Sequence, residues 1–243
     1  MFGARLASSS LLRRNLSAAP VAAVECAWGE AAAADTNPDT TAGEHHSASA
    51  IFASTAVSVV IVPGWRNSGL GHWQSLWAQR IPGAIRVQQQ EWQQPHKAPW
   101  VDGVVQAIVA APHPVVLAAH SLGCIASIHA IESLGDDATA RIAGALLVAP
   151  ADPERRAVFD DFTPVPAQPL PFTSIVAASS NDPYCPIRTA SAYAKSWGST
   201  FVRVPDAGHI NIESGHGEWP LGWALLGALA AQAQQRRAVF EAA

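Results

Sequence analysis

The sequence has few cysteines, few charges and no long hydrophobic run, and each shortage excludes a class of protein. Its three cysteines, Cys26, Cys124 and Cys185, form no Cys-x-x-Cys pair and are odd in number. A disulfide framework and a structural zinc site both need grouped cysteines, so neither is expected. Because a chain without such groups is typical of a reducing compartment, we predict a cytoplasmic protein.

Charge and hydropathy exclude two further classes of partner. Lys and Arg number 15 against 19 Asp and Glu, which gives a formal charge of −4 and no basic footprint for nucleic acid. The longest apolar candidate, residues 221–233, is interrupted by glycine and is shorter than the ~20 residues that a membrane-spanning helix needs. We expect neither a nucleic-acid nor a membrane partner, and nothing in the sequence indicates a protein partner.

The glycine-rich signatures of nucleotide binding are also missing. Neither Gly-x-Gly-x-x-Gly nor a Gly-Lys-Ser/Thr run occurs, so the glycine-rich loop after the first predicted strand is not expected to bind a nucleotide phosphate, and with the cysteines ungrouped we predict no metal site. Hydrophobic residues, in contrast, make up 49% of the chain and charged residues only 14%. This composition favours a well-buried core and argues against a chain that is disordered throughout.

Residues 1–56 differ from the rest of the chain. They are rich in Ala, Ser and Thr, and residues 35–47 follow neither helical nor strand periodicity, so we expect a disordered or loosely attached extension. The first 24 residues contain arginines and serines but no acid, which is the composition of a transit peptide. A non-functional extension or a start codon placed too far upstream explains the same composition, and we favour that interpretation.

From Val57 onward, strand-like and helix-like segments alternate, which predicts one α/β domain over residues 57–243. Near-continuous apolar strands separated by helices are typical of a parallel sheet with helices on both faces. We expect the ligand site at the carboxyl ends of the strands. The predicted strands are 57–62, 85–88, 115–119, 143–149, 174–178 and 200–204, and the predicted helices are 71–81, 98–110, 122–134, 187–197 and 220–237.

The segment around Ser121 is the most informative in the chain. An apolar strand leads into Ala119-His-Ser-Leu-Gly123, and the sequence turns helical at once. This is the strand–turn–helix context of a nucleophile elbow, Gly-x-Ser-x-Gly, with alanine at the first glycine. Because an elbow holds the serine hydroxyl above the carboxyl edge of the sheet, we predict that Ser121 is a catalytic nucleophile.

A serine nucleophile needs a base to take its proton and an acid to orient that base. After an elbow of this kind the two partners follow in the order Asp or Glu, then His. Asp182 lies on a turn directly after one predicted strand, and His209 follows the next, so we predict them as acid and base. A plain turn is the alternative role for Asp182. Asp206 and His216 are rivals, but the first suits a loop cap and the second lies farther from the strand end.

Acyl transfer also needs hydrogen-bond donors for the developing oxyanion. The predicted donors are the backbone N–H of Leu122, directly after the nucleophile, and that of Trp65, with Gly64 allowing the backbone to come close. The residues assigned to a substrate pocket are Gly64, Trp92, His120 and Trp219. The tryptophans expected in the core are Trp73, Trp77, Trp197 and Trp223.

Several segments together resemble one family. They are Val62-Pro-Gly-Trp-Arg-Asn-Ser, His72-Trp73, Gln90-Glu-Trp-Gln-Gln-Pro95, Ala119-His-Ser-Leu-Gly123, Ser179-Ser-Asn-Asp-Pro-Tyr184, Gly208-His-Ile-Asn-Ile-Glu-Ser-Gly215 and Trp219-Pro220. Over residues 57–236 the chain resembles the small α/β-hydrolases related to retinoblastoma-binding protein 9 and the bacterial YdeN-like proteins. Alanine at the first elbow position is normal for that group, and Glu91 stands where relatives often carry aspartate.

The resemblance implies a compact, lidless α/β-hydrolase fold with a six-stranded, mainly parallel sheet. It also implies a triad of Ser121, Asp182 and His209 that hydrolyses small esters or peptide-like substrates without a cofactor. We therefore predict a carboxylesterase-like serine hydrolase that works through an acyl-enzyme, on small carboxylic esters and also on amides or peptides.

The alternative function is a protein-binding module on the same fold with little turnover, which would not need three residues at three strand ends. A dehalogenase is disfavoured because the elbow carries serine rather than aspartate. Haloperoxidase and acyltransferase activities use the same triad and stay open.

Overall fold

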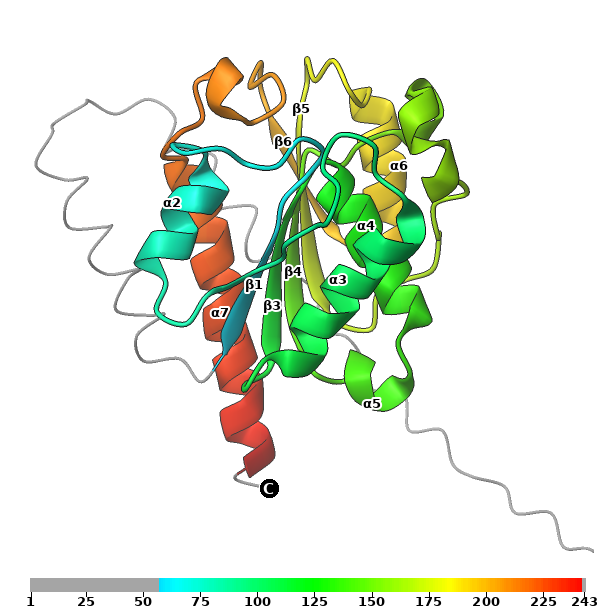
Figure 1. Ribbon diagram of the computed structural model, residues 1–243. Coiled ribbons are helices and arrows are strands. Elements are labelled where there is room, and N and C mark those ends of the chain that lie inside the picture. The colour runs from blue at the N-terminus through cyan, green and yellow to red at the C-terminus, as the bar shows by residue number, and fades with distance from the viewer. Residues whose placement is uncertain (1–56, 242–243) are drawn as a thin grey trace, which may run out of the picture. The chain divides into compact units, whose positions relative to one another are not determined.

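The computed structural model describes residues 57–241, so the predicted N-terminal extension lies outside the described residues. The described part forms a six-stranded parallel sheet in the order β2-β1-β3-β4-β5-β6, with helices on both faces (Figure 1). This confirms the predicted fold class. The strands are β1 Ser58–Val62, β2 Ile85–Arg86, β3 Val115–His120, β4 Ile142–Val148, β5 Thr173–Ser179 and β6 Thr200–Val204.

Each α-helix before α7 lies between two successive strands, α7 follows the last strand, and the five longer helices lie where the sequence predicts them. The second strand is shorter than predicted because it is an edge strand that pairs with β1 through Ile85 and Arg86 alone. The helices are α2 Trp73–Arg80, α3 Lys97–Ala110, α4 Leu122–Ser133, α5 Asp136–Thr139, α6 Ile187–Trp197 and α7 Pro220–Glu241, with 3-10 helices η1 Pro153–Arg155, η2 Ala157–Phe162 and η3 Ile212–Ser214.

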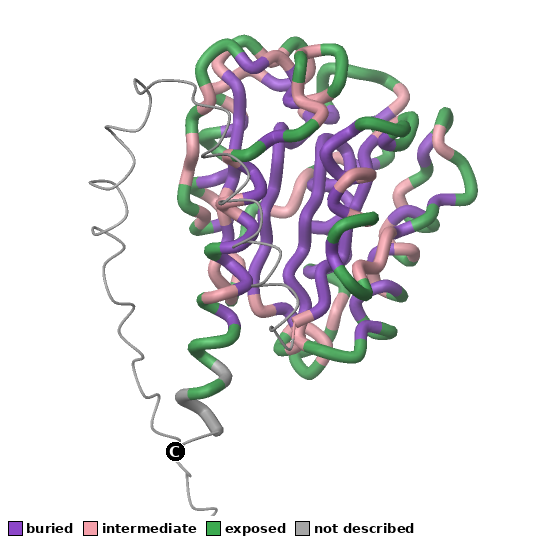
Figure 2. Tube along the Cα trace, turned by 90° about the vertical axis from the view of Figure 1, so that its left-hand side faces the viewer, coloured by how far each residue is buried: buried purple, intermediate pink, exposed green. Residues whose placement is uncertain are grey.

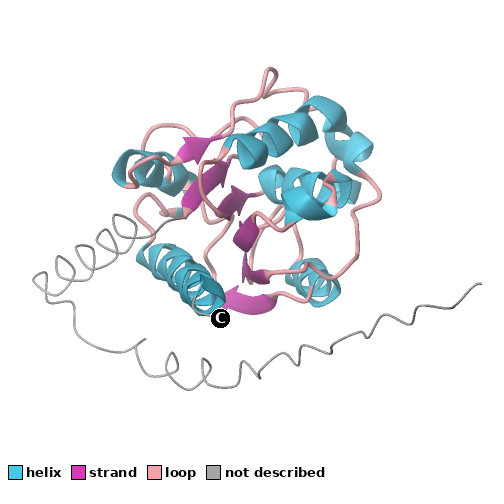
Figure 3. Cartoon of the chain, turned by 90° about the horizontal axis from the view of Figure 1, so that it is seen from below, coloured by secondary structure: helices cyan, strands magenta, loops and turns pink. Residues whose placement is uncertain are grey.

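The two faces of the sheet pack against different helices (Figure 3). One hydrophobic cluster joins the sheet to α3, α4 and α6, and the other joins it to α2 and α7. In β1, Val60 and Val62 belong to the first cluster and Val59 and Ile61 to the second, because side chains alternate along a strand. Both faces are covered, so the central strands are buried along their whole length (Figure 2).

Helix α7 packs one side on the sheet and leaves the other to solvent. It begins at Pro220, whose fixed φ suits the first turn of a helix. Trp223, Leu226 and Leu229 are buried against the sheet, while Arg236 is exposed. None of the helices within residues 57–241 has the length and apolar composition needed to span a bilayer.

The chain changes direction across the sheet after β1, which pairs with β2 on one side and β3 on the other. The loops that follow β1 and β3 therefore leave the carboxyl edge of the sheet next to each other. Such a switch point is where open α/β sheets bind their ligands. This edge is uppermost in Figure 1, and the loops after β5 and β6 reach it as well.

Candidate active site

Ser121 lies on a tight turn between β3 and α4. Its φ of 54° is in the left-handed region, which costs a residue with a side chain of order 1–3 kcal/mol. The Ser121 N–H donates to the carbonyl oxygen of Val148 at 3.0 Å, which helps to hold this conformation. A Cβ at Gly123 would lie 2.6 Å from the carbonyl oxygen of Pro63, so only glycine lets α4 begin this close to the end of β1. The geometry of a nucleophile elbow is present.

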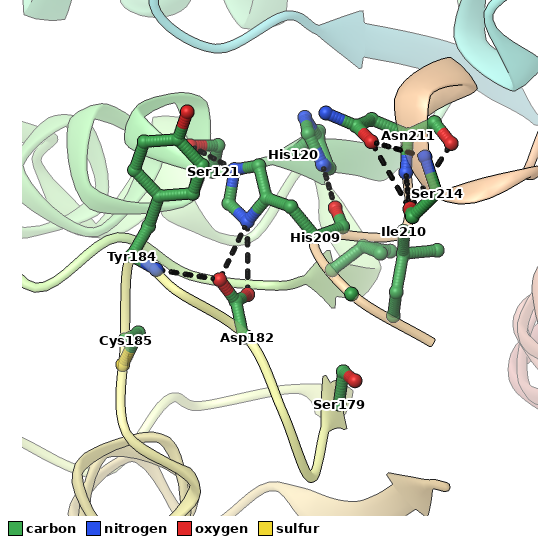
Figure 4. A network of polar contacts seen from close by, with 12 residues as sticks. His120, Ser121, Ser179, Asp182, Tyr184, Cys185, His209, Ile210, Asn211 and Ser214 are labelled. Atoms are coloured by element: carbon green, nitrogen blue, oxygen red, sulfur yellow. Dashed lines mark hydrogen bonds and ion pairs between the residues drawn. The ribbon is translucent and has the colours of Figure 1, made fainter. Parts of the chain in front are cut away.

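Three side chains from three strand ends meet at this turn (Figure 4). Nε2 of His209 lies 2.9 Å from Oγ of Ser121. Nδ1 of the same ring lies 2.8 Å and 3.0 Å from the two carboxylate oxygens of Asp182. The side chains of His209 and Asp182 are only 9% and 2% exposed, so water competes little for these hydrogen bonds. The structure thus brings together the residues that the sequence predicts as nucleophile, base and acid.

The loops after β5 and β6, which carry the carboxylate and the imidazole, are bonded to each other through two residues that sequence reasoning missed. Oγ of Ser179 donates to Oδ1 of Asn181 at 2.8 Å and accepts from the N–H of Ala207 at 2.9 Å. Oδ1 of Asn181 also accepts from the N–H of Gly208 at 2.7 Å. In the sequence these residues look like ordinary turn composition, because their partners lie on another loop.

The two rival residues bond elsewhere. Oδ1 of Asp206 accepts from Oγ of Ser180 at 3.0 Å, which bridges the same two loops at the surface. Nδ1 of His216 lies 3.4 Å from Oγ of Ser214, within the segment that caps η3. The carboxylate beside the imidazole is therefore the one on the loop after β5.

His120 is buried beneath His209 and does not face a substrate pocket, which corrects the prediction for this residue. It is 5% exposed, and its Nε2 lies 2.9 Å from the backbone carbonyl oxygen of His209. Side chains alternate along β3, so His120 points to the α2 and α7 face with Val116 and Ala118. The ring packs edge to face on that of His72, with ring centroids 5.0 Å apart.

Both buried histidines behind His209 are neutral near pH 7. Burial, and then the neighbouring His209 and His72, lower the pKa of His120 well below its ordinary value. A neutral His120 can use its single ring proton only as a donor from Nε2 to the carbonyl oxygen. Burial also lowers the pKa of His72 to about 4. Nδ1 of His72 accepts from the N–H of Gln74 at 3.2 Å and caps α2.

The loop after β1 lies directly against the elbow. A Cβ added to Gly64 would lie 2.7 Å from Cβ of Ser121 and 3.4 Å from the backbone nitrogen of Leu122. Real Cβ atoms do not approach another carbon as closely as the first of these distances. Glycine at position 64 is therefore what allows this loop to touch the nucleophile.

Two backbone N–H groups beside Ser121 are left without an acceptor. In the same loop, the N–H of Arg66 donates to the carbonyl oxygen of Trp92 at 3.1 Å, and that of Asn67 donates to Gly64 at 3.0 Å. Among the hydrogen bonds within residues 57–241, none uses the N–H of Trp65 or of Leu122. These are the two groups predicted from the sequence as oxyanion donors.

The family follows from comparison with known proteins. The model of the serine hydrolase family matches residues 59–228. The chain belongs to the serine hydrolase family. It is similar to a YdeN-like hydrolase from Pectobacterium atrosepticum, with 34% identity over 80% of this chain and 99% of that one and a TM-score of 0.68. This confirms the predicted resemblance to YdeN-like serine hydrolases.

Two further solved structures share the fold with this serine hydrolase. The product of the ydeN gene of B. subtilis is 22% identical over 72% of this chain and 98% of that one, with a TM-score of 0.61. Est1E from Butyrivibrio proteoclasticus is 12% identical over 74% of this chain and 90% of that one, with a TM-score of 0.54. No curated protein sequence matches the chain.

The two tryptophans that the sequence analysis assigns to the pocket of this serine hydrolase lie in different places. Trp92 is half-buried and packs edge to face on Trp100, with ring centroids 5.7 Å apart. Trp219 is 5% exposed and stacks on Trp77, so it belongs to the core rather than to a pocket. The ring also packs against Trp73, with centroids 5.3 Å apart, in the hydrophobic cluster of α2 and α7. The tryptophans expected in the core, Trp73, Trp77, Trp197 and Trp223, are all buried.

The cysteines of the described part are unsuited to act as nucleophiles in this serine hydrolase. Cys124 and Cys185 are buried, and burial raises the pKa of both thiols, that of Cys185 to about 12. A thiol reacts as its thiolate, which is scarce at such a pKa. Within residues 57–241, no group of three or more His, Cys, Asp or Glu side chains is placed to hold a metal ion.

Proposed function

We propose that this serine hydrolase cleaves small carboxylic esters through an acyl-enzyme formed on Ser121. The observation that carries the proposal is the unbroken chain of hydrogen bonds from Asp182 through His209 to the Ser121 hydroxyl. A serine in this arrangement is activated by an adjacent base, and that base is oriented by a carboxylate.

In the first half of the reaction, Nε2 of His209 takes the hydroxyl proton while Oγ of Ser121 forms a bond to the ester carbonyl carbon. The carbonyl oxygen becomes an oxyanion, which the N–H groups of Trp65 and Leu122 stabilise. The intermediate then collapses, the bond to the alkoxide breaks, and His209 gives its proton to the leaving oxygen. Water repeats the cycle on the acyl-enzyme and releases the acid.

The charges around His209 support this cycle. Asp182 stabilises the imidazolium that forms after the first proton transfer. His120 and His72 lie behind the base, and both are neutral near pH 7 because burial lowers their pKa. No positive charge from these two rings therefore opposes protonation of His209.

The connections between strands favour small substrates. Residues 149–172, which leave this edge after β4, form only the two short helices η1 and η2 and a loop. A lid that binds bulk lipid would need more chain than this connection offers. We therefore expect esters of short acyl chains to be the best substrates.

The test is labelling with a fluorophosphonate probe, read by intact mass, on the wild type and on Ser121→Ala and His209→Ala. We expect one adduct on the wild type and none on either variant. A panel of 4-nitrophenyl esters from acetate to laurate then measures chain preference. A folded wild type that neither labels nor turns over any ester would contradict the proposal and support the binding-module alternative.

A further inference from the structure

An arginine side chain lies between two aromatic rings at the candidate active site. Arg156 joins η1 to η2, and its Cζ lies 4.5 Å from the ring centroid of Tyr184 and 5.4 Å from that of Trp65. Arginine packs well on aromatic faces, and contacts of this kind hold the guanidinium in one place. Cζ of Arg66 lies 4.0 Å over the ring of Trp65 as well.

Both rings belong to the immediate surroundings of the triad. The Tyr184 ring lies 4.3 Å from the His209 ring, centroid to centroid. Trp65 directly follows Gly64, the residue that contacts the elbow, and its ring packs edge to face on Phe159 of η2. The guanidinium of Arg156 therefore packs on the same Tyr184 ring that packs on His209.

Among the described residues, the guanidinium of Arg156 has no ion-pair partner. The ion pairs within residues 57–241 are Arg80–Glu218 and His209–Asp182, and neither involves Arg156 or Arg66.

Three acidic side chains, Glu91, Asp152 and Glu154, form no ion pair with Arg156. Glu91 accepts hydrogen bonds from the N–H groups of Gln93 and Gln94. Burial raises the pKa of Tyr193 of α6, and the charges of Asp152 and Glu154, which precede Arg156 in the sequence, add to that effect.

A guanidinium that uses its faces for stacking keeps its edge free for hydrogen bonds. All five N–H donors of arginine lie in the plane of the group, where they match a carboxylate in a two-pronged contact. Arg156 lies over the Tyr184 ring, makes no side-chain hydrogen bond within residues 57–241 and is exposed to solvent, so its donors are available to an anionic partner. If the arginine served only to pack on these rings, its removal would affect charged and neutral substrates equally.

We propose that Arg156 is a specificity-determining residue that binds a carboxylate carried by the substrate, so that esters of dicarboxylic acids are preferred over neutral esters. The proposal rests on the proposed function, because it concerns the substrate of the same site. The contact is partly exposed, so salt weakens it.

The test uses two esters of similar length, 4-nitrophenyl butyrate and mono-4-nitrophenyl glutarate, which differ in one carboxylate. For each protein we take the ratio of kcat/KM for the glutarate to that for the butyrate. We expect Arg156→Gln to lower this ratio about three- to tenfold, in keeping with a charge-assisted hydrogen bond at a partly exposed site. The matched control is Arg155→Gln, which removes an exposed arginine one position earlier and should keep the wild-type ratio.

A second measurement does not depend on any variant. Raising the salt concentration from about 0.05 M to about 0.5 M should lower the ratio in the wild type, because this range shortens the screening distance several-fold. The inference would be overturned if Arg156→Gln had the same ratio as the wild type, or if the wild-type ratio did not change with salt concentration. Turnover of neither ester together with absent labelling of Ser121 would instead count against the proposed function.

Discussion

The imidazole of His209 is fixed from two directions. Asp182 binds its Nδ1, and His120 bonds the backbone carbonyl of the same residue from below. The His120 and His209 rings also touch, with centroids 4.8 Å apart. Because His120 is neutral and buried, we expect it to act through position and not through charge. Its hydrogen bond to the backbone holds the loop that carries His209 beside Ser121.

Replacing His120 should therefore affect the rate more than substrate binding. His120→Leu leaves the buried carbonyl of His209 without its donor, which costs about 1–3 kcal/mol and loosens the loop. We expect kcat for 4-nitrophenyl butyrate to fall about tenfold or more while KM changes little. His120→Gln is the matched control, since its amide N–H can occupy the place of Nε2–H, and it should keep most of the wild-type kcat. An equal loss in both variants would argue against the positioning role.

At the scale of elements, the site depends on how closely the loop after β1 and the start of α4 approach each other. Gly123 lets the helix touch the end of β1, and Gly64 lets the loop touch Ser121. The same contact sets the positions of the two free N–H groups. A change of one carbon atom at this contact therefore moves Ser121 and the N–H groups of Trp65 and Leu122 relative to each other.

Gly64→Ala tests this dependence. The added methyl group would collide with Ser121, so the loop must move, and a displacement of about 1 Å at a catalytic group can cost on the order of a hundredfold in rate. We expect kcat/KM for 4-nitrophenyl acetate to fall by about that factor. Gly69→Ala, in the same loop, adds a methyl group that meets nothing within 4 Å and should stay close to the wild type. Similar activity of the two variants would contradict the predicted contact.

For the whole molecule, the buried histidines make stability depend on pH. The folded protein holds His72 neutral down to a pKa of about 4, whereas the unfolded chain binds that proton with an ordinary pKa of 6.5. Between these values the unfolded state binds more protons, so the free energy of unfolding decreases as the pH falls from about 6.5 to about 4. His120, whose pKa is also lowered, acts in the same direction.

His72→Asn isolates the contribution of this histidine. Oδ1 of asparagine can accept from the N–H of Gln74 and so keep the α2 cap, but the side chain does not titrate. We expect the wild type to lose about 2–3 kcal/mol more than the variant between pH 7 and about pH 4.5. Urea unfolding at the two pH values measures both losses. If the wild type and the variant lost equal free energy of unfolding, the pH dependence would not come from His72.

Much of the fold could be predicted from the sequence because its strands are buried on both faces. Runs such as residues 115–119 are apolar at every position, and the segments between such runs have helical spacing. Helix α5 and the 3-10 helices were not predicted, since each is too short to show a period. The sequence predicts β2 two residues too long, because its register with β1 covers only Ile85 and Arg86. The N–H of Val87 donates the last hydrogen bond to that strand, at 2.9 Å from the carbonyl oxygen of Ile61.

The sequence predicts those residues of the candidate site whose positions follow from the order of strands along the chain. It does not predict the residues whose positions depend on contacts between loops. Ser121, Asp182 and His209 each follow a predicted strand, so the parallel sheet alone brings them to one edge. Ser179 and Asn181 act across two loops, and a single sequence carries no signal for such pairing. His120 could have been placed correctly, because the alternation along β3 turns it away from the substrate side.

The backbone of Ser121 implies a conflict between durability and activity. A φ of 54° causes no steric strain in glycine, but it does in serine, which carries a Cβ. Selection for stability alone would therefore remove the hydroxyl from the position that we propose as the nucleophile. A search for heat-resistant variants of this chain should hold position 121 fixed, because a substitution there that raised the stability would also remove the hydroxyl proposed to react.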